Sequence, residues 1–155
     1  MQSFGSNTWA NLFLLLIAIF GLWRLIRSFR RWLAMRSLAK RIGLAYRGDT
    51  LPAALDGVET IPTSVTRFSN VIDGQLNGIR VVAFDYGQGT RTLGYKGTAI
   101  AAKTDGDLFR TIPKNQGFTL ERSEGWIVLH QPNGYNWPGE ILSVRALEKM
   151  LRTLG

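Results

Sequence analysis

The sequence opens with a long, mainly apolar stretch, and its first charged side chain appears only at Arg24. From Phe13 to Phe20 the residues are apolar on every face of a helix, which is typical of a segment surrounded by lipid. Extended to Ile26, a helix starting at Trp9 is about 27 Å long at about 1.5 Å per residue, close to the roughly 30 Å core of a bilayer. We therefore predict a transmembrane helix over residues 9–26.

Two other interpretations of this apolar stretch are weaker. A secretory signal peptide carries basic residues before its apolar run and a small-residue cleavage site after it. Here residues 1–11 contain no basic residue, and the arginines follow the run. A buried core helix is possible for so short a run, but the sequence predicts no second long helix to cover it. A single-pass anchor explains the pattern best.

After the apolar stretch, basic residues alternate with apolar ones at broadly helical spacing. This predicts a basic juxtamembrane helix over residues 27–42, ended by Gly43. The net charge of +8 lies entirely between Arg24 and Arg47, because the residues from 48 onward carry 11 basic and 11 acidic side chains. The basic residues concerned are Arg24, Arg27, Arg30, Arg31, Arg36, Lys40, Arg41 and Arg47.

The one-sided charge predicts an orientation. Arginine and lysine near a span are retained on the cytoplasmic side, and here they follow the span and do not precede it. We expect residues 1–8 to form an extracytoplasmic tail at a bacterial inner membrane, and residues 43–155 to form a cytoplasmic domain. Tryptophans are enriched at membrane interfaces. The predicted membrane-interface residues are Trp9, Trp23, Arg24, Arg27, Arg30 and Arg31.

Beyond Gly43, short segments with strand character alternate with turn formers. An Asn77-Gly78 turn joins a strand over about 69–76 to one over 79–84, and Ser123–Gly125 joins strands 117–122 and 126–130. Further strands are expected at 44–46 and 98–104, with one helical turn at 51–55. A helix at 143–154 has Ser143 as its N-cap and one apolar stripe. This order predicts an α+β fold: a mainly antiparallel sheet with the C-terminal helix packed on it.

The domain also contains a longer pattern. Asn70-Val-Ile-Asp-Gly74, followed by Val81-Val-Ala-Phe-Asp-Tyr86 and a late Glu124-Gly-Trp126, resembles the core pattern of a family of uncharacterised bacterial single-span membrane proteins. The resemblance covers roughly residues 36–154. It implies a membrane-anchored α+β domain, and it implies no activity and no site residue.

The residues that could carry chemistry have simpler structural roles. Asp73 is expected in a turn, and Asp85 is expected to bond backbone or an arginine such as Arg80. The glycines of Gly87–Gly97 lie between strands, unlike phosphate loops, which open a helix. Ser123 and His130 lack an oxyanion hole. The chain has one histidine and no cysteine, which disfavours zinc. We predict no catalytic residue, no metal and no cofactor.

The predicted partners are the bilayer and another protein. Tyr135 and Trp137, in a turn-rich loop, are the candidate partner contacts, although they could equally cap the core. Nucleic acid is disfavoured because the domain carries no net charge. The leading hypothesis is a non-enzymatic protein that binds another protein or joins a membrane complex. The alternatives are a sensor of anionic lipid at the inner leaflet and a small enzyme with an unrecognised site.

Overall fold

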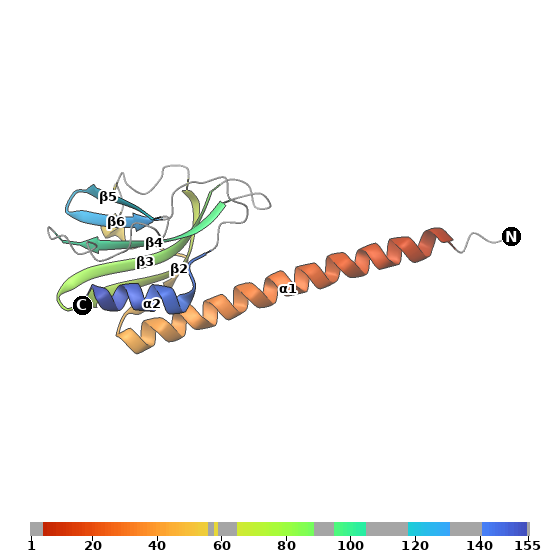
Figure 1. Ribbon diagram of the computed structural model, residues 1–155, viewed down its shortest axis with the longest axis horizontal. Helices are drawn as coiled ribbons and strands as arrows, with labels where there is room; N and C mark the ends of the chain where they lie inside the picture. Colours follow the sequence, from red (N-terminus) through yellow and green to blue (C-terminus); the bar gives the residue numbers. More distant parts are fainter. Residues whose placement is uncertain are drawn as a thin grey trace. The chain divides into compact units, whose positions relative to one another are not determined.

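A computed structural model describes residues 5–55, 58, 65–88, 95–104, 118–130 and 141–154 (Figure 1). The chain divides into two compact units, Met1–Ala34 and Met35–Gly155. The first consists of most of helix α1 (Gly5–Ile42), and the second contains the last turns of α1, a sheet and helix α2 (Val144–Thr153).

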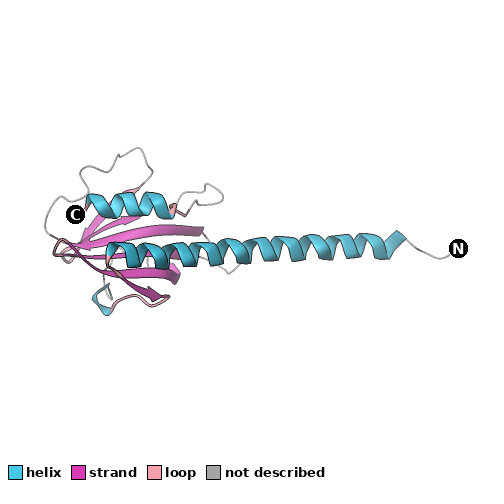
Figure 2. Ribbon diagram, turned by 90° about the horizontal axis from the view of Figure 1, so that it is seen from below, coloured by secondary structure: helices cyan, strands magenta, loops and turns pink. Residues whose placement is uncertain are grey.

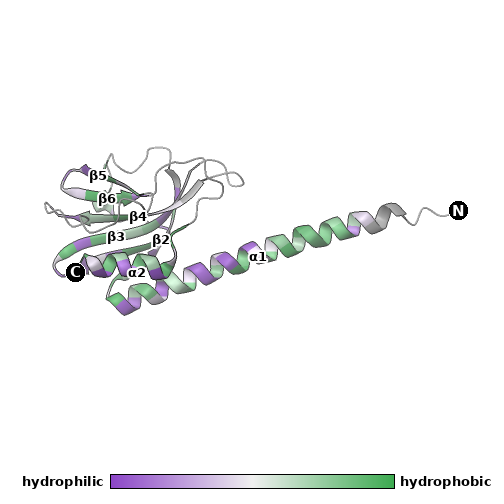
Figure 3. Cartoon of the chain, viewed as in Figure 1, coloured by the Kyte–Doolittle hydropathy of each residue, from purple (hydrophilic) through white to green (hydrophobic). Residues whose placement is uncertain are grey.

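The first unit is a helix with its apolar side chains on the outside. From Trp9 to Leu33 its large apolar residues are 45–76% exposed, apart from Trp32, which is half-buried. Hydrophobic residues fill the first part of α1, and hydrophilic ones alternate with them further along (Figure 3). Within the described residues, α1 is the one helix long and apolar enough to cross a membrane, and its most apolar part has no buried side chain. That exposure distinguishes it from the core helix of a soluble protein.

The second unit is built on one antiparallel sheet. Its strands within the described residues are β1 (Ala45–Gly48), β2 (Val65–Leu76), β3 (Ile79–Gln88), β4 (Tyr95–Lys103), β5 (Thr119–Ser123) and β6 (Trp126–His130). They lie in the order β1-β2-β3-β4-β6-β5, and every neighbouring pair is antiparallel. With α2, this confirms the predicted α+β class and mainly antiparallel sheet.

Two tight turns fix the strand pairing. Asn77 and Gly78 both have positive φ, 49° and 82°, as a two-residue type I′ turn requires, and they join β2 to β3. Glu124 and Gly125, with φ of 51° and 76°, join β5 to β6 in the same way. Both turns lie where the sequence predicts them, because each combines a short polar connection with a glycine that adopts positive φ without steric cost.

One face of the sheet is covered by two helices. The last turns of α1 and helix α2 lie side by side across it (Figure 2). Met35 and Leu38 of α1 and Leu147 and Leu151 of α2 are fully buried against the strands. The compact unit therefore begins at Met35, eight residues before the domain start at residue 43 that the sequence suggested. The reason is that these turns of α1 supply core side chains as well as surface arginines.

The opposite face has its own core. Along β3, Val82, Phe84 and Tyr86 point to this face, and they alternate with residues that point toward the helices. Leu55, which ends the short 3₁₀ helix η1 (Ala53–Leu55), packs onto them. Phe68 meets Phe84 edge-on with 5.6 Å between ring centroids. Because both faces are covered, β3 and β4 are buried for most of their length.

The helix ends near the sheet are capped as the sequence predicts. Gly43 has a φ of 74° just after α1, and the Leu44 N–H donates to the Ala39 carbonyl at 2.9 Å, which is the hydrogen bond of a Schellman cap. Ser143 begins α2, and its Oγ accepts from the Ala146 N–H at 3.2 Å. These two caps fix where each helix starts or stops over the sheet.

Candidate functional site

The six predicted membrane-interface residues all lie on α1. Trp9 is 76% exposed and Trp23 is 53% exposed. Arg24, Arg27 and Arg30 are exposed, and Arg31 is half-buried. The Arg27 guanidinium lies over the Trp23 ring, 5.5 Å from its centroid, which is cation–π geometry. Arg27 is therefore held near the indole at the end of the apolar stretch.

The predicted partner contacts cannot be placed in the same way. Tyr135 and Trp137 lie outside the described residues, as does the glycine-rich segment 89–94. Their roles remain predictions. The candidate site residues of the domain that can be located are therefore its buried polar side chains.

Asp73 is buried and lies in strand β2, in contrast to the turn position that the sequence suggested. The tighter Asn77-Gly78 pair makes the turn and leaves Asp73 inside the strand. Its two carboxylate oxygens accept from the Arg80 Nε and a terminal guanidinium nitrogen at 3.3 and 3.4 Å. Arg47 approaches within 3.6 Å from β1. Two arginines thus offset the cost of burying this carboxylate at the β1–β2–β3 edge of the sheet.

Asp85 anchors a row of hydrogen-bonded side chains that crosses four strands. The Thr98 hydroxyl donates to one carboxylate oxygen at 2.8 Å, and the Asn70 amide donates to the other at 2.9 Å. The Tyr46 hydroxyl donates to the Asn70 carbonyl oxygen at 3.1 Å. We call Tyr46, Asn70, Asp85 and Thr98 the cross-strand polar row. It links β1, β2, β3 and β4, and it gives Asp85 two side-chain partners, Asn70 and Thr98, that the sequence did not indicate.

The sequence indicated a role only for Asp85 of this row and missed those of Tyr46, Thr98 and Asn70. Asn70 lies at an irregular position of β2. It has a φ of 54° at a bulge where β2 has one residue more than β3, between the pairs Ser69–Asp85 and Ile72–Ala83. Asparagine tolerates the left-handed region better than most residues. The bulge turns its amide toward Asp85. The available signal was an asparagine inside an otherwise β-forming run.

The environment of the row affects the Tyr46 hydroxyl. Partial burial of the phenol raises the pKa of Tyr46 above its ordinary value, and the negative charges of Asp49 and Asp85 raise it further. Arg36 acts in the opposite direction. Tyr46 thus keeps its proton and stays a hydrogen-bond donor to Asn70 at any physiological pH.

Ser123 and His130 do not form a catalytic pair. They stand at opposite ends of the β5–β6 hairpin, because Ser123 pairs with Trp126 while His130 pairs with Thr119. Four residues of strand separate these two positions, which is about 13 Å. His130 instead contacts Glu121 through its Nε2 at 3.0 Å. Strand pairing in this hairpin therefore keeps the Ser123 hydroxyl away from the His130 imidazole, so the two residues do not form a nucleophile and its base.

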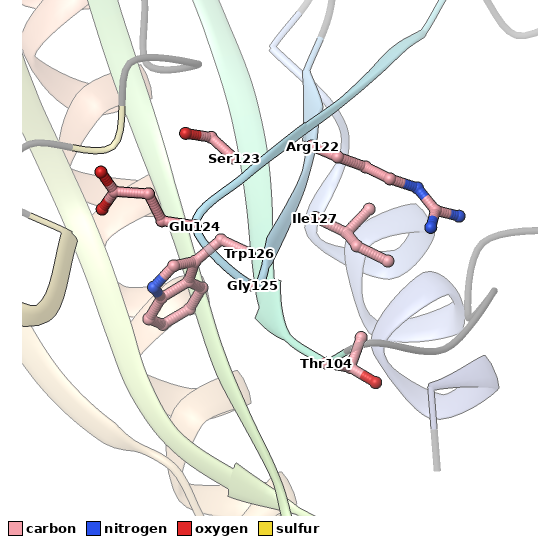
Figure 4. Close-up of a pocket in the computed structure, with 7 residues that line it drawn as sticks. All are labelled: Thr104, Arg122, Ser123, Glu124, Gly125, Trp126 and Ile127. Carbon is pink, nitrogen blue, oxygen red and sulfur yellow. The ribbon is translucent and has the colours of Figure 1, made fainter.

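A depression of about 280 Å³ lies at the tip of the same hairpin. Figure 4 shows that the side chains around it do not converge. Arg122 and Ile127 extend to one side of the hairpin, whereas Glu124 and Trp126 extend to the other (Figure 4). Small-molecule sites instead aim a few polar groups at a common point. No group of three histidine, aspartate or glutamate side chains suited to a metal occurs among the residues the structure describes.

These observations define a class: a chain with one candidate membrane-spanning helix and an antiparallel α+β domain whose buried polar groups are tied to one another. Comparison with known proteins found no matching family model, no matching curated protein and no matching solved structure. The resemblance to uncharacterised single-span membrane proteins therefore stays a prediction.

Proposed function

We propose that this chain is a single-span protein of a bacterial inner membrane whose cytoplasmic domain binds another protein or joins a membrane complex. The observation that carries the proposal is the first part of α1, which is apolar, exposed along its length and followed by arginines on one side only. Lipid is the surrounding that removes such a surface from water. The positive-inside rule puts the residues after the arginines in the cytoplasm.

The hydrogen bonds of the Asp73 and Asp85 carboxylates favour a binding protein over an enzyme. A general base or a metal ligand must turn an oxygen toward a reactant. Both oxygens of Asp73 contact Arg80, and both oxygens of Asp85 contact side chains of the cross-strand polar row. These groups hold strands together, so a structural role explains their burial.

The proposal is tested by exchanging the two units. The full-length chain is crosslinked in native membranes, purified through a C-terminal tag, and compared with a chimera in which residues 1–34 are replaced by an unrelated single-span anchor. We expect one protein to co-purify in a fixed ratio with both chains, because the domain beginning at Met35 carries the contact. A second chimera that keeps residues 1–34 and replaces the domain is expected to lose that protein.

Two results would contradict the proposal. One is a full-length chain that recovers no stoichiometric protein from its own membranes. The other is a purified full-length chain that turns over a substrate and loses this activity, while staying folded, when Asp85→Asn or Asp73→Asn is introduced.

A further inference from the structure

Three arginines directly beyond the apolar part of α1 form a compact basic surface. Arg24, Arg27 and Arg30 follow one another at intervals of three residues and are all exposed. We call them the arginine face. At about 1.5 Å per residue their Cα atoms span only about 9 Å along the helix axis, and at about 100° per residue they share one side of it.

Helix α1 itself supplies no acidic side chain for these charges. The first acidic residue in the sequence is Asp49, so the whole of α1 contains none. Three guanidinium groups on successive turns raise the local positive potential, and an external anion lowers it.

The depth of the arginine face in the bilayer indicates which anion it meets. The apolar stretch ends at Trp23, and the headgroup region beyond a bilayer core is roughly 5–8 Å deep on each side. Arg27 and Arg30 follow the predicted span of residues 9–26 and lie at the depth of lipid phosphates, and Arg24, in the last turn of that span, reaches the same depth along its aliphatic stem. Guanidinium binds phosphate oxygens in a bidentate manner, and contact between Arg27 and the Trp23 ring keeps one guanidinium near the interface.

From this geometry we propose that the arginine face binds the headgroups of anionic phospholipids and concentrates them around α1. The inference rests on the proposed single-span anchor and deepens it, because it names a lipid partner for residues that would otherwise only set orientation. The lipid contact is independent of any protein that the domain binds.

The experiment measures which lipids surround the full-length chain. The purified protein is reconstituted in phosphatidylcholine vesicles, and its association with spin-labelled phosphatidylglycerol is compared by electron paramagnetic resonance with its association with spin-labelled phosphatidylcholine. We expect on the order of a fivefold preference for phosphatidylglycerol, the factor that corresponds to about 1 kcal/mol for one arginine at a charged surface. The preference is expected to fall in 1 M salt, where the Debye length is about 3 Å.

Matched variants separate local binding from overall charge. The triple variant Arg24→Gln, Arg27→Gln, Arg30→Gln is expected to bring the preference below about twofold, whereas lysine at the same three positions keeps most of it. The control Arg67→Gln, Arg145→Gln, Lys149→Gln removes three exposed charges from the domain and is expected to leave the preference unchanged.

Three results would overturn the inference. These are equal association of both lipids with the wild-type chain, a preference that survives the glutamine substitutions in the arginine face, and an equal loss in the control. Flotation and protease protection of the same vesicles report insertion. Failure of α1 to insert would overturn the anchor and the lipid contact together, whereas insertion without lipid preference would overturn the lipid contact alone.

Discussion

Asn70 connects the two halves of the cross-strand polar row. Its amide donates to buried Asp85 and its carbonyl oxygen accepts from Tyr46, while its backbone has a φ of 54°. One residue thus combines a strained backbone with two side-chain hydrogen bonds. Strain of this kind persists where the surrounding structure determines it, here a bulge in β2.

Substitution of Asn70 separates these two contributions. Asn70→Ala is expected to lower the free energy of unfolding by about 3 kcal/mol, because it deprives Asp85 of a donor and places alanine, which adopts the left-handed region less readily than asparagine, at a positive φ. Asn70→Gly removes the same hydrogen bonds without that steric cost, so it is expected to cost about 1 kcal/mol less. Urea titration of the full-length chain in mild detergent, followed by near-ultraviolet circular dichroism, measures both. Losses below about 0.5 kcal/mol in both variants would contradict the role given to the row.

The raised pKa of Tyr46 predicts a dependence of stability on alkaline pH. Because the folded chain holds this proton more tightly than the unfolded chain, the folded state binds more protons between the two pKa values. The stabilisation is therefore complete below the ordinary tyrosine pKa of about 10 and is lost as the pH rises through the folded value. Spectrophotometric titration of the phenolates should show one tyrosine that ionises late and disappears in Tyr46→Phe. A late ionisation that persists in Tyr46→Phe would belong to another tyrosine and would contradict this prediction.

At the residue scale, the sequence predicts the turns and caps better than the polar contacts. Asn77-Gly78, Gly43 and Ser143 were identifiable because each acts through its own backbone or that of close neighbours. The partners of Asp73 and Asp85 depend on strand register across the sheet. A single sequence does not determine which side chains register brings together, so the Asn70–Asp85–Thr98 contacts were not foreseen.

Helix α1 changes its role along its length. Before Ala34 its large apolar side chains, apart from the half-buried Trp32, are exposed, whereas Met35 and Leu38 are fully buried in the core of the second unit. Arg41 near its end forms an ion pair with Glu148 of α2 at 2.7 Å. The final turns of α1 are therefore a structural part of the domain, in addition to carrying basic residues.

A pair of leucine substitutions tests this division. Leu38→Ala is expected to destabilise the domain by about 2–5 kcal/mol, because it leaves a cavity between α1 and the sheet. Leu33→Ala, at a position 45% exposed, is the matched control and is expected to change the unfolding free energy by less than about 0.5 kcal/mol. Thermal and urea unfolding of the two full-length variants give the comparison. Equal effects would place the start of the domain elsewhere.

At the element scale, periodicity predicted α2 because one side of it is buried, and β-forming runs between turn formers predicted most strands. The same reasoning assigned residues 27–42 to a surface helix, since arginines dominate the composition there. Helical spacing also places Met35, Leu38 and Ile42 along one stripe, three and four residues apart. The structure shows that this stripe is the continuation of the core.

The whole molecule combines a candidate membrane-spanning helix, an arginine face and a domain in which the buried carboxylates of the described residues contact neighbouring side chains. The two buried carboxylates stabilise the sheet, and the charges that face outward near the apolar stretch are arginines. Function in such a chain depends on where the domain is held and on what binds its surface. The side of the membrane on which the domain lies is therefore the central claim.

Cysteine labelling tests that claim most directly, because the chain has no cysteine of its own. Ser3→Cys and Gln75→Cys, the latter at an exposed position of β2, each introduce a single thiol. In intact spheroplasts a membrane-impermeant maleimide is expected to label Ser3→Cys at once and Gln75→Cys only after permeabilisation. Labelling of Gln75→Cys in intact spheroplasts, with Ser3→Cys protected, would contradict the account.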